Sequence, residues 1–139
     1  MADVRGLKMR IPALGGEVIA RAGGTPVTMP GSEIFTSLQS GAIDAAEWIG
    51  PYNDLAFGLY KAAKYYYYPG GQEPGSTLEM IINQAAFDSL PPDLREIVLA
   101  CASATNDRLA AEFTARNAEA LQTLVRDHGV LVRPYPDDV

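Results

Sequence analysis

The chain has only one cysteine, one histidine and one tryptophan in 139 residues. The single Cys101 excludes an intrachain disulfide, and the alanines on either side of it favour a buried position in a helix. The single His128 stands beside Gly129 at an expected helix end, where a capping role is favoured over catalysis. No nucleophile and base pair can be recognised, so we predict that the chain is not an enzyme.

Positive charge is also scarce, with 11 Lys and Arg against 17 Asp and Glu and a formal net charge of -6. Because no Lys or Arg cluster is present, nucleic acid is not an expected partner. No apolar run approaches the roughly 18 residues that a membrane-spanning helix needs. No charged and then apolar leader precedes Asp3, so we expect a soluble polypeptide without an export signal in the sequence as given.

A double glycine at 15–16 is not accompanied by the spacing of a nucleotide-binding loop. Neither Gly-x-Gly-x-x-Gly nor a Gly-Lys-Ser/Thr pair occurs there, so nucleotide binding is not predicted. What is present is an ordinary globular composition, with 47% hydrophobic and 20% charged residues. A chain of this size and composition is expected to form a core without disulfides or metals.

The first fifty residues alternate between strand and helix patterns. Pro12 closes the first strand, Ser32 is a suitable N-cap for the second helix, and Gly41 suits its C-terminal end. Strand, helix, strand, helix and strand in such a short stretch indicate parallel βαβ units. The expected strands cover 8–11, 25–29 and 42–48, and the expected helices cover 17–22 and 32–40.

The remainder of the chain reads as longer elements. A helix from about Asp54 is expected to run into the four tyrosines at 65–68, and a strand is expected at 77–83, with at most two helical turns before Leu90. A helix beginning at Pro91-Pro92 meets no Pro or Gly before Gly129 and would have about 35 residues, roughly 53 Å. It must either break around 104–106 or extend onto another chain or domain. A last strand is expected at 130–135.

Polar residues at strand ends mark the candidate site. Glu47 and Trp48 end the third strand, Arg10 lies near the end of the first, and Glu73 stands in a glycine-rich loop. Arginine presents a planar fork that matches a carboxylate. Two carboxylates near a backbone carbonyl suit a hard cation such as Ca²⁺ or Na⁺. From composition alone, each of these candidates would be interpreted as an ordinary surface charge. The candidate site by itself therefore does not identify a function.

Several motifs, in order along essentially the whole chain, resemble one protein family. They are Gly6-Leu7-Lys8-Met9-Arg10-Ile11-Pro12, the run from Gly31 to Asp44, Glu47-Trp48, the run from Tyr65 to Pro69, and Glu73-Pro74-Gly75. Together they resemble the solute-binding proteins of TRAP (tripartite ATP-independent periplasmic) transporters, in the branch that binds α-keto and hydroxy acids. The resemblance implies an α/β fold with a short, mainly parallel sheet flanked by helices and a long C-terminal helix. This fold would be half of a two-lobed periplasmic binding protein.

The resemblance also assigns roles to the candidate residues. Arg10 would hold the carboxylate of a small organic acid, and the Trp48 ring would wall the substrate pocket. A bridging Na⁺ or Ca²⁺ would take side-chain oxygens from Glu47 and Glu73 and the backbone carbonyl of Trp48, with no organic cofactor. It further implies a periplasmic location and a partnership with TRAP membrane subunits.

Family members are roughly twice as long, so the chain resembles a fragment that covers mainly the second lobe. A further cation ligand, a glutamine in the family, would lie in the part that this chain lacks. We expect a lobe over residues 1–51 that carries Arg10, and a second part over 52–139, with a homodimer formed through the long helix. The alternative hypothesis is a self-associating folded fragment that binds no ligand and has only a structural role.

Overall fold

The computed structural model describes residues 4–70, 75 and 78–137. The chain divides into two compact units: unit 1 is Met1–Pro74 with Asn117–Val139, and unit 2 is Gly75–Arg116. The division that the sequence predicted, after residue 51, remains a prediction. In the described part of the chain, no helix combines the length and the apolar character that a membrane crossing requires.

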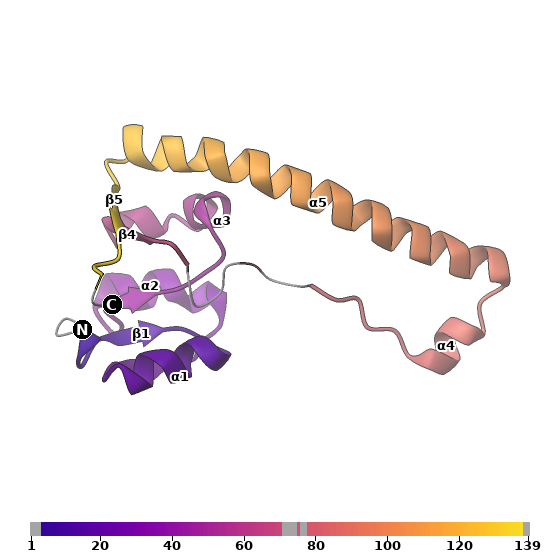
Figure 1. Ribbon diagram of the computed structural model, residues 1–139, viewed down its shortest axis with the longest axis horizontal. Helices are drawn as coiled ribbons and strands as arrows, with labels where there is room; N and C mark the ends of the chain where they lie inside the picture. Colours follow the sequence, from indigo (N-terminus) through magenta and orange to yellow (C-terminus); the bar gives the residue numbers. More distant parts are fainter. Residues whose placement is uncertain (1–3, 71–74, 76–77, 138–139) are drawn as a thin grey trace. The chain divides into compact units, whose positions relative to one another are not determined.

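A three-stranded parallel sheet forms the first layer of unit 1 (Figure 1). Strand β1 (Lys8–Arg10) lies in the middle, with β2 (Thr25–Val27) on one side and β3 (Ala45–Ala46) on the other. Arg10 pairs with Val27 in one neighbour and with Ala46 in the other. The predicted parallel βαβ arrangement is therefore confirmed, and the carboxyl ends of the strands lie at one edge of the sheet.

Helix α1 (Ala13–Arg21) connects β1 to β2 and begins earlier than the sequence predicted. The double glycine was expected to precede this helix, but Gly15 and Gly16 are buried inside it. A Cβ atom on Gly16 would lie 3.0 Å from the Ile11 carbonyl oxygen and 3.3 Å from Cβ of Pro26. The glycine allows the helix to pack closely against the strands, which local sequence could not show.

The second connection starts with a 3₁₀ turn, η2 (Gly31–Glu33), followed by helix α2 (Ile34–Ser40). Ser32 was predicted to cap this helix, but it lies inside η2, and the N-cap position is Glu33 with no side-chain cap. The prediction for Gly41 is confirmed, because this glycine ends α2 with a left-handed φ of 73°.

The tyrosine run was predicted as the end of a helix, and this prediction is wrong. Helix α3 (Pro51–Ala56) is short, a 3₁₀ turn η3 (Leu59–Lys61) follows, and the tyrosines form strand β4 (Tyr65–Tyr68). β4 pairs in parallel with β5 (Leu131–Pro134), from Tyr65 opposite Leu131 to Tyr68 opposite Pro134. Aromatic residues favour strands once a partner strand is supplied, and here the partner comes from the far end of the chain.

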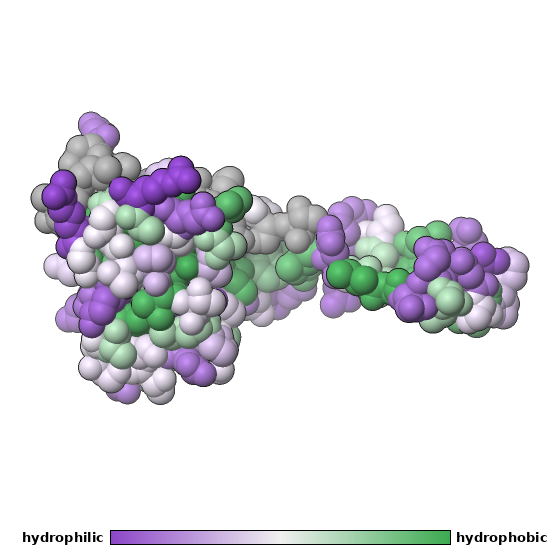
Figure 2. All heavy atoms as spheres, turned by 90° about the horizontal axis from the view of Figure 1, so that it is seen from below, coloured by the Kyte–Doolittle hydropathy of each residue, from purple (hydrophilic) through white to green (hydrophobic). Residues whose placement is uncertain are grey.

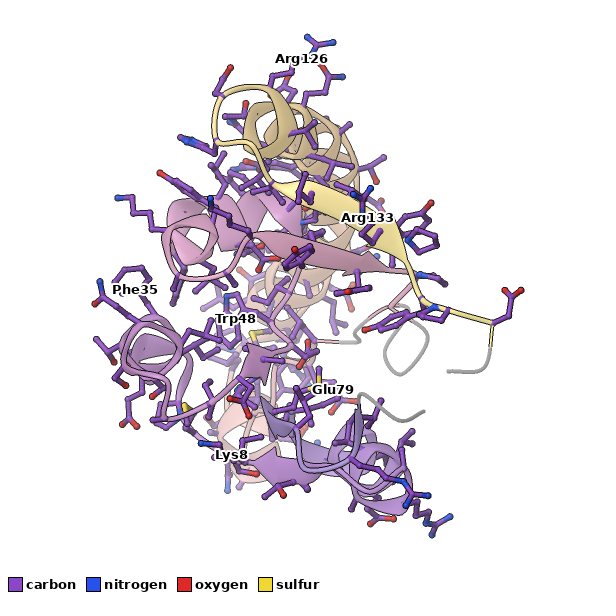
Figure 3. The ribbon with its side chains drawn as sticks, turned by 90° about the vertical axis from the view of Figure 1, so that its left-hand side faces the viewer. Lys8, Phe35, Trp48, Glu79, Arg126 and Arg133 are labelled. Atoms are coloured by element: carbon purple, nitrogen blue, oxygen red, sulfur yellow. The ribbon has the colours of Figure 1, made fainter. Side chains whose placement is uncertain are left out.

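The core of unit 1 lies between these elements. Ile34 of α2 and Leu124 near the end of the last helix are almost completely buried. Figure 3 shows Trp48 between the β1–β3 layer and the β4–β5 pair, where this residue is half-buried. His128 stacks on the ring of Tyr60, with 3.8 Å between the ring centroids. On the face seen in Figure 2, hydrophobic residues lie among hydrophilic ones. Helix α1 exposes Leu14 and Val18.

Unit 2 contains helix α4 (Gln84–Asp88) and the first part of helix α5 (Pro92–Arg126). The expected length of α5 is confirmed at 35 residues, and the break considered near 104–106 does not occur. The strand predicted at 77–83 is not found, because the described residues 78–83 form neither helix nor strand. Cys101 was expected to be buried, but it is exposed. Apolar patterning suggested burial from the sequence, yet Leu94, Ile97 and Leu99 of unit 2 are exposed.

Candidate functional site

Arg10 is a buried charge at the carboxyl end of β1, with only 7% of its surface exposed. Its guanidinium donates from Nε to the Met29 carbonyl oxygen at 3.3 Å and from Nη1 to the Glu47 carbonyl oxygen at 2.8 Å. These two acceptors come from the segments that follow β2 and β3, on either side of β1. The order of the strands therefore places an acceptor on each side of Arg10, and the two hydrogen bonds hold its guanidinium in one orientation.

Glu47 meets Arg10 twice, through its backbone and through its side chain. The Glu47 N–H donates to the Arg10 carbonyl oxygen at 2.8 Å, which extends the β1–β3 pairing by one residue. The Glu47 carboxylate lies 3.4 Å from Nη1 of Arg10, and both side chains are about nine-tenths buried, 9% and 11% exposed. In this partly dry setting the pair interacts more strongly than a surface ion pair would.

Trp48 places its ring beside the guanidinium. The ring centroid is 5.2 Å from Cζ of Arg10, within the range of a cation–π interaction, and 5.3 Å from the ring of Phe57. The indole Nε1–H is buried and has no hydrogen-bond acceptor among the described residues. A buried donor of this kind costs free energy unless an acceptor such as a bound oxygen or water supplies the missing bond.

The structure thus brings together three of the four residues that the sequence singled out, Arg10, Glu47 and Trp48. Glu73 lies outside the described residues. Met29, which accepts from Arg10, and Phe57, which packs on Trp48, were not predicted to take part. An open hollow of about 260 Å³ beside α1, which includes Ile11, Glu17 and Thr28 in its lining, contains none of the predicted site residues.

The oxygen atoms at this site could form part of the coordination shell of a hard cation. Within the described ranges, no group of three or more His, Cys, Asp and Glu side chains could hold a metal. Glu47 and the Trp48 carbonyl would supply two adjacent kinds of oxygen, whereas Ca²⁺ takes about six to eight oxygen ligands. Glu47 and Trp48 alone supply too few ligands for such a cation. The remaining oxygen ligands would have to come from Glu73, the bound acid, water or other parts of the protein.

A second buried acid lies on α3, just beyond the Trp48 segment. Tyr66 of β4 donates a short hydrogen bond from its hydroxyl to Oδ2 of Asp54. Burial raises the pKa of Asp54 to about 6, and the hydrogen bond from Tyr66, with smaller effects of the backbone near Gly50 and Ile49, opposes that rise. Burial, together with the neighbouring carboxylate, also raises the pKa of Tyr66. The sequence gave no signal for this pair.

Curated and solved relatives match this chain over nearly its whole length. A monocarboxylate 2-oxoacid-binding periplasmic protein from Nostoc sp. is 45% identical over 139 residues, which are 100% of this chain and 38% of the relative. A TRAP solute-binding protein from Colwellia psychrerythraea, solved with calcium and pyruvate, is 40% identical with a TM-score of 0.93, covering 99% of this chain and 42% of the other. One from Pseudoalteromonas atlantica, solved with sodium and pyruvate, is 40% identical with a TM-score of 0.88, covering 97% and 41%.

The chain therefore spans about two fifths of the length of these relatives. A family model described as bacterial extracellular solute-binding protein, family 7, matches residues 1–139. The proteins of this family are periplasmic and act as solute-binding components of transport systems rather than as enzymes. Because the family model matches residues 1–139 and the fold agrees, this chain belongs to the bacterial extracellular solute-binding protein family 7, the solute-binding proteins of TRAP transporters.

Proposed function

We propose that this chain forms the second-lobe part of a periplasmic TRAP solute-binding protein that binds a small α-keto or hydroxy carboxylate. Arg10 binds the carboxylate, and the Trp48 ring forms a wall of the pocket. A Na⁺ or Ca²⁺ ion bridges acid and protein through Glu47, the Trp48 carbonyl and Glu73. The whole protein would deliver the acid to TRAP membrane subunits.

The observation that carries the proposal is the buried arginine at the strand end. A buried guanidinium is costly unless its donors are satisfied. Nε and Nη1 of Arg10 donate within the described chain, and no bond from Nη2 to a described residue is seen. The carboxylate of a bound acid would therefore accept a hydrogen bond from Nη2. Bidentate binding would require Nη1 to donate to this carboxylate as well as to Glu47.

Electrostatics gives a reason for a cation beside Glu47. Glu47 lies beside the position where a substrate carboxylate would bind, so two negative groups would repel each other there. A cation on Glu47 offsets that repulsion and leaves Arg10 able to interact with the acid. Relatives that are 40% identical hold pyruvate with calcium or with sodium, which supports either ion.

The test is calorimetric titration of the folded chain with pyruvate, in the presence of calcium, of sodium, or of a chelator in potassium buffer. We expect heat with calcium or sodium and at least about tenfold weaker binding, 1.4 kcal/mol, without them. Methyl pyruvate, which has no charged carboxylate, should give no heat. This uncharged analogue tests the arginine role without altering the protein.

Arg10→Lys keeps the charge and removes the planar fork, so we expect it to weaken pyruvate binding by roughly tenfold or more. Arg21→Ala is the matched control, because Arg21 is an exposed arginine on α1. It should bind like the wild type. Equal affinity of Arg10→Lys and wild type, with circular dichroism showing both folded, would contradict the assigned role.

A second candidate is a self-associating folded fragment without ligand binding. It is favoured by the apolar side chains that unit 2 exposes, including Leu78 at 81% and Ile81 at 89%. Absence of heat with every ion and acid tested, from a folded wild-type chain, would support this candidate and remove the binding proposal.

A further inference from the structure

Gly31 lies directly against the ring of Trp48. A Cβ atom built on Gly31 would lie 2.4 Å from Cη2, 2.8 Å from Cζ2 and 2.9 Å from Cζ3 of the indole. All three atoms belong to the six-membered half of the ring, and no side chain can be accommodated at such distances. The backbone of Gly31 is not in the left-handed region, so the glycine is required for space and not for its conformational freedom.

The ring has little room to move away from a larger residue. Phe57 packs against it at 5.3 Å between centroids, and the Arg10 guanidinium is 5.2 Å from its centre. The segments that carry Gly31 and Trp48 also carry the two carbonyl groups that hold Arg10. Met29 is two residues before Gly31, and Glu47 is immediately before Trp48.

We infer that Gly31 is a positioning residue: it seats the Trp48 ring beside the Arg10 guanidinium and thereby fixes the orientation in which Arg10 meets a carboxylate. A side chain at position 31 displaces the ring, which removes the cation–π contact and shifts the Glu47 carbonyl that orients Nη1. The consequence for carboxylate affinity rests on the proposed function. The seating of the ring does not, because it exists without ligand.

The first experiment uses Gly31→Ala without ligand. Trp48 is the only tryptophan, so intrinsic fluorescence reports on it directly. We expect Gly31→Ala to shift the emission to longer wavelength and to increase quenching by acrylamide at least about twofold. Ser32→Ala, in the same 3₁₀ turn, is the control and should leave both signals unchanged. Wild-type emission and quenching in a folded Gly31→Ala protein would overturn the inference.

The second experiment is a double-mutant cycle with Trp48→Phe, which lacks the three ring atoms that a Cβ would meet. Gly31→Ala should weaken pyruvate binding at least tenfold in the wild-type background and less than about twofold in the Trp48→Phe background. A loss of the same size in both backgrounds would overturn the positioning role, since a general folding defect would not depend on residue 48. If the wild-type chain binds no acid, the proposed function is wrong. The fluorescence experiment would still test whether Gly31 positions the Trp48 ring.

Discussion

Asp54 carries its carboxylate inside unit 1, where it is 8% exposed and accepts a hydrogen bond from the Tyr66 hydroxyl. Burial disfavours the charged form and raises its pKa to about 6 from 3.8. The folded protein therefore holds this proton more tightly than the unfolded chain does. Asp54 contributes stability below about pH 4, and this contribution is lost as pH rises through about 6.

Asp54→Asn should remove this pH dependence while an amide oxygen still accepts from Tyr66. Near pH 4 the variant and wild type should have similar free energies of unfolding. At pH 7 the variant should be more stable by up to about 3 kcal/mol, which is the pKa shift converted at about 1.4 kcal/mol per unit. Urea unfolding at both pH values measures the difference.

The matched control for Asp54→Asn is Glu17→Gln, which removes an exposed carboxylate from α1. Its stability difference from wild type should change little between the two pH values. If Asp54→Asn shows the same difference at pH 4 and pH 7, the raised pKa of the buried acid is contradicted.

Helix α3 receives its N-terminal cap from another element. The N-cap residue, Gly50, has no side chain to offer, and Oδ1 of Asn117 in α5 accepts the Tyr52 N–H at 3.0 Å instead. A Cβ on Gly50 would lie 3.2 Å from that oxygen. Because α3 follows the Glu47-Trp48 segment directly, this cap also anchors the end of the candidate site.

Replacing the capping side chain should destabilise the protein measurably. We expect Asn117→Ala to have a free energy of unfolding about 1 kcal/mol lower than Asn106→Ala, the usual cost of losing an N-cap. Both changes exchange Asn for Ala within α5, so helix propensity cancels, and Asn106 is exposed with no capping contact. Equal stability of the two variants in urea would show that the cap contributes nothing.

Across the whole molecule, exposed apolar side chains favour association with further protein surface. The part of α5 within unit 2 exposes Leu94 at 43%, Ile97 at 54% and Leu99 at 55%. We propose that α5 pairs with the same helix of a second copy, because a surface of this kind is more often buried than left in water. The homodimer expected from the sequence remains a proposal.

Ile97→Glu should weaken such a dimer by at least tenfold, about 1.4 kcal/mol, because it places a charge in an apolar interface. Thr105→Glu adds the same charge at another exposed position of the helix and should have a smaller effect. Sedimentation velocity over a range of concentrations measures both. A wild-type chain that stays monomeric throughout would rule out the dimer.

The amino-acid sequence by itself determined the elements that depend on local patterns. Pro12, Pro92 and Gly41 end or begin elements through backbone constraints that act in any context, so β1, α5 and the end of α2 were predicted correctly. The motifs around Arg10 and Glu47 also indicated the family, and parallel strand order then required these two residues to meet at one sheet edge.

Only the tertiary structure decided the rest. The tyrosines at 65–68 became a strand because β5, more than sixty residues away, pairs with them, and residues 78–83 lack regular structure because no strand of the described chain pairs with them. Gly31 and Asn117 owe their roles to contacts across the fold, with Trp48 and with Tyr52. Such contacts depend on packing distances between distant segments, which no local pattern in the sequence encodes.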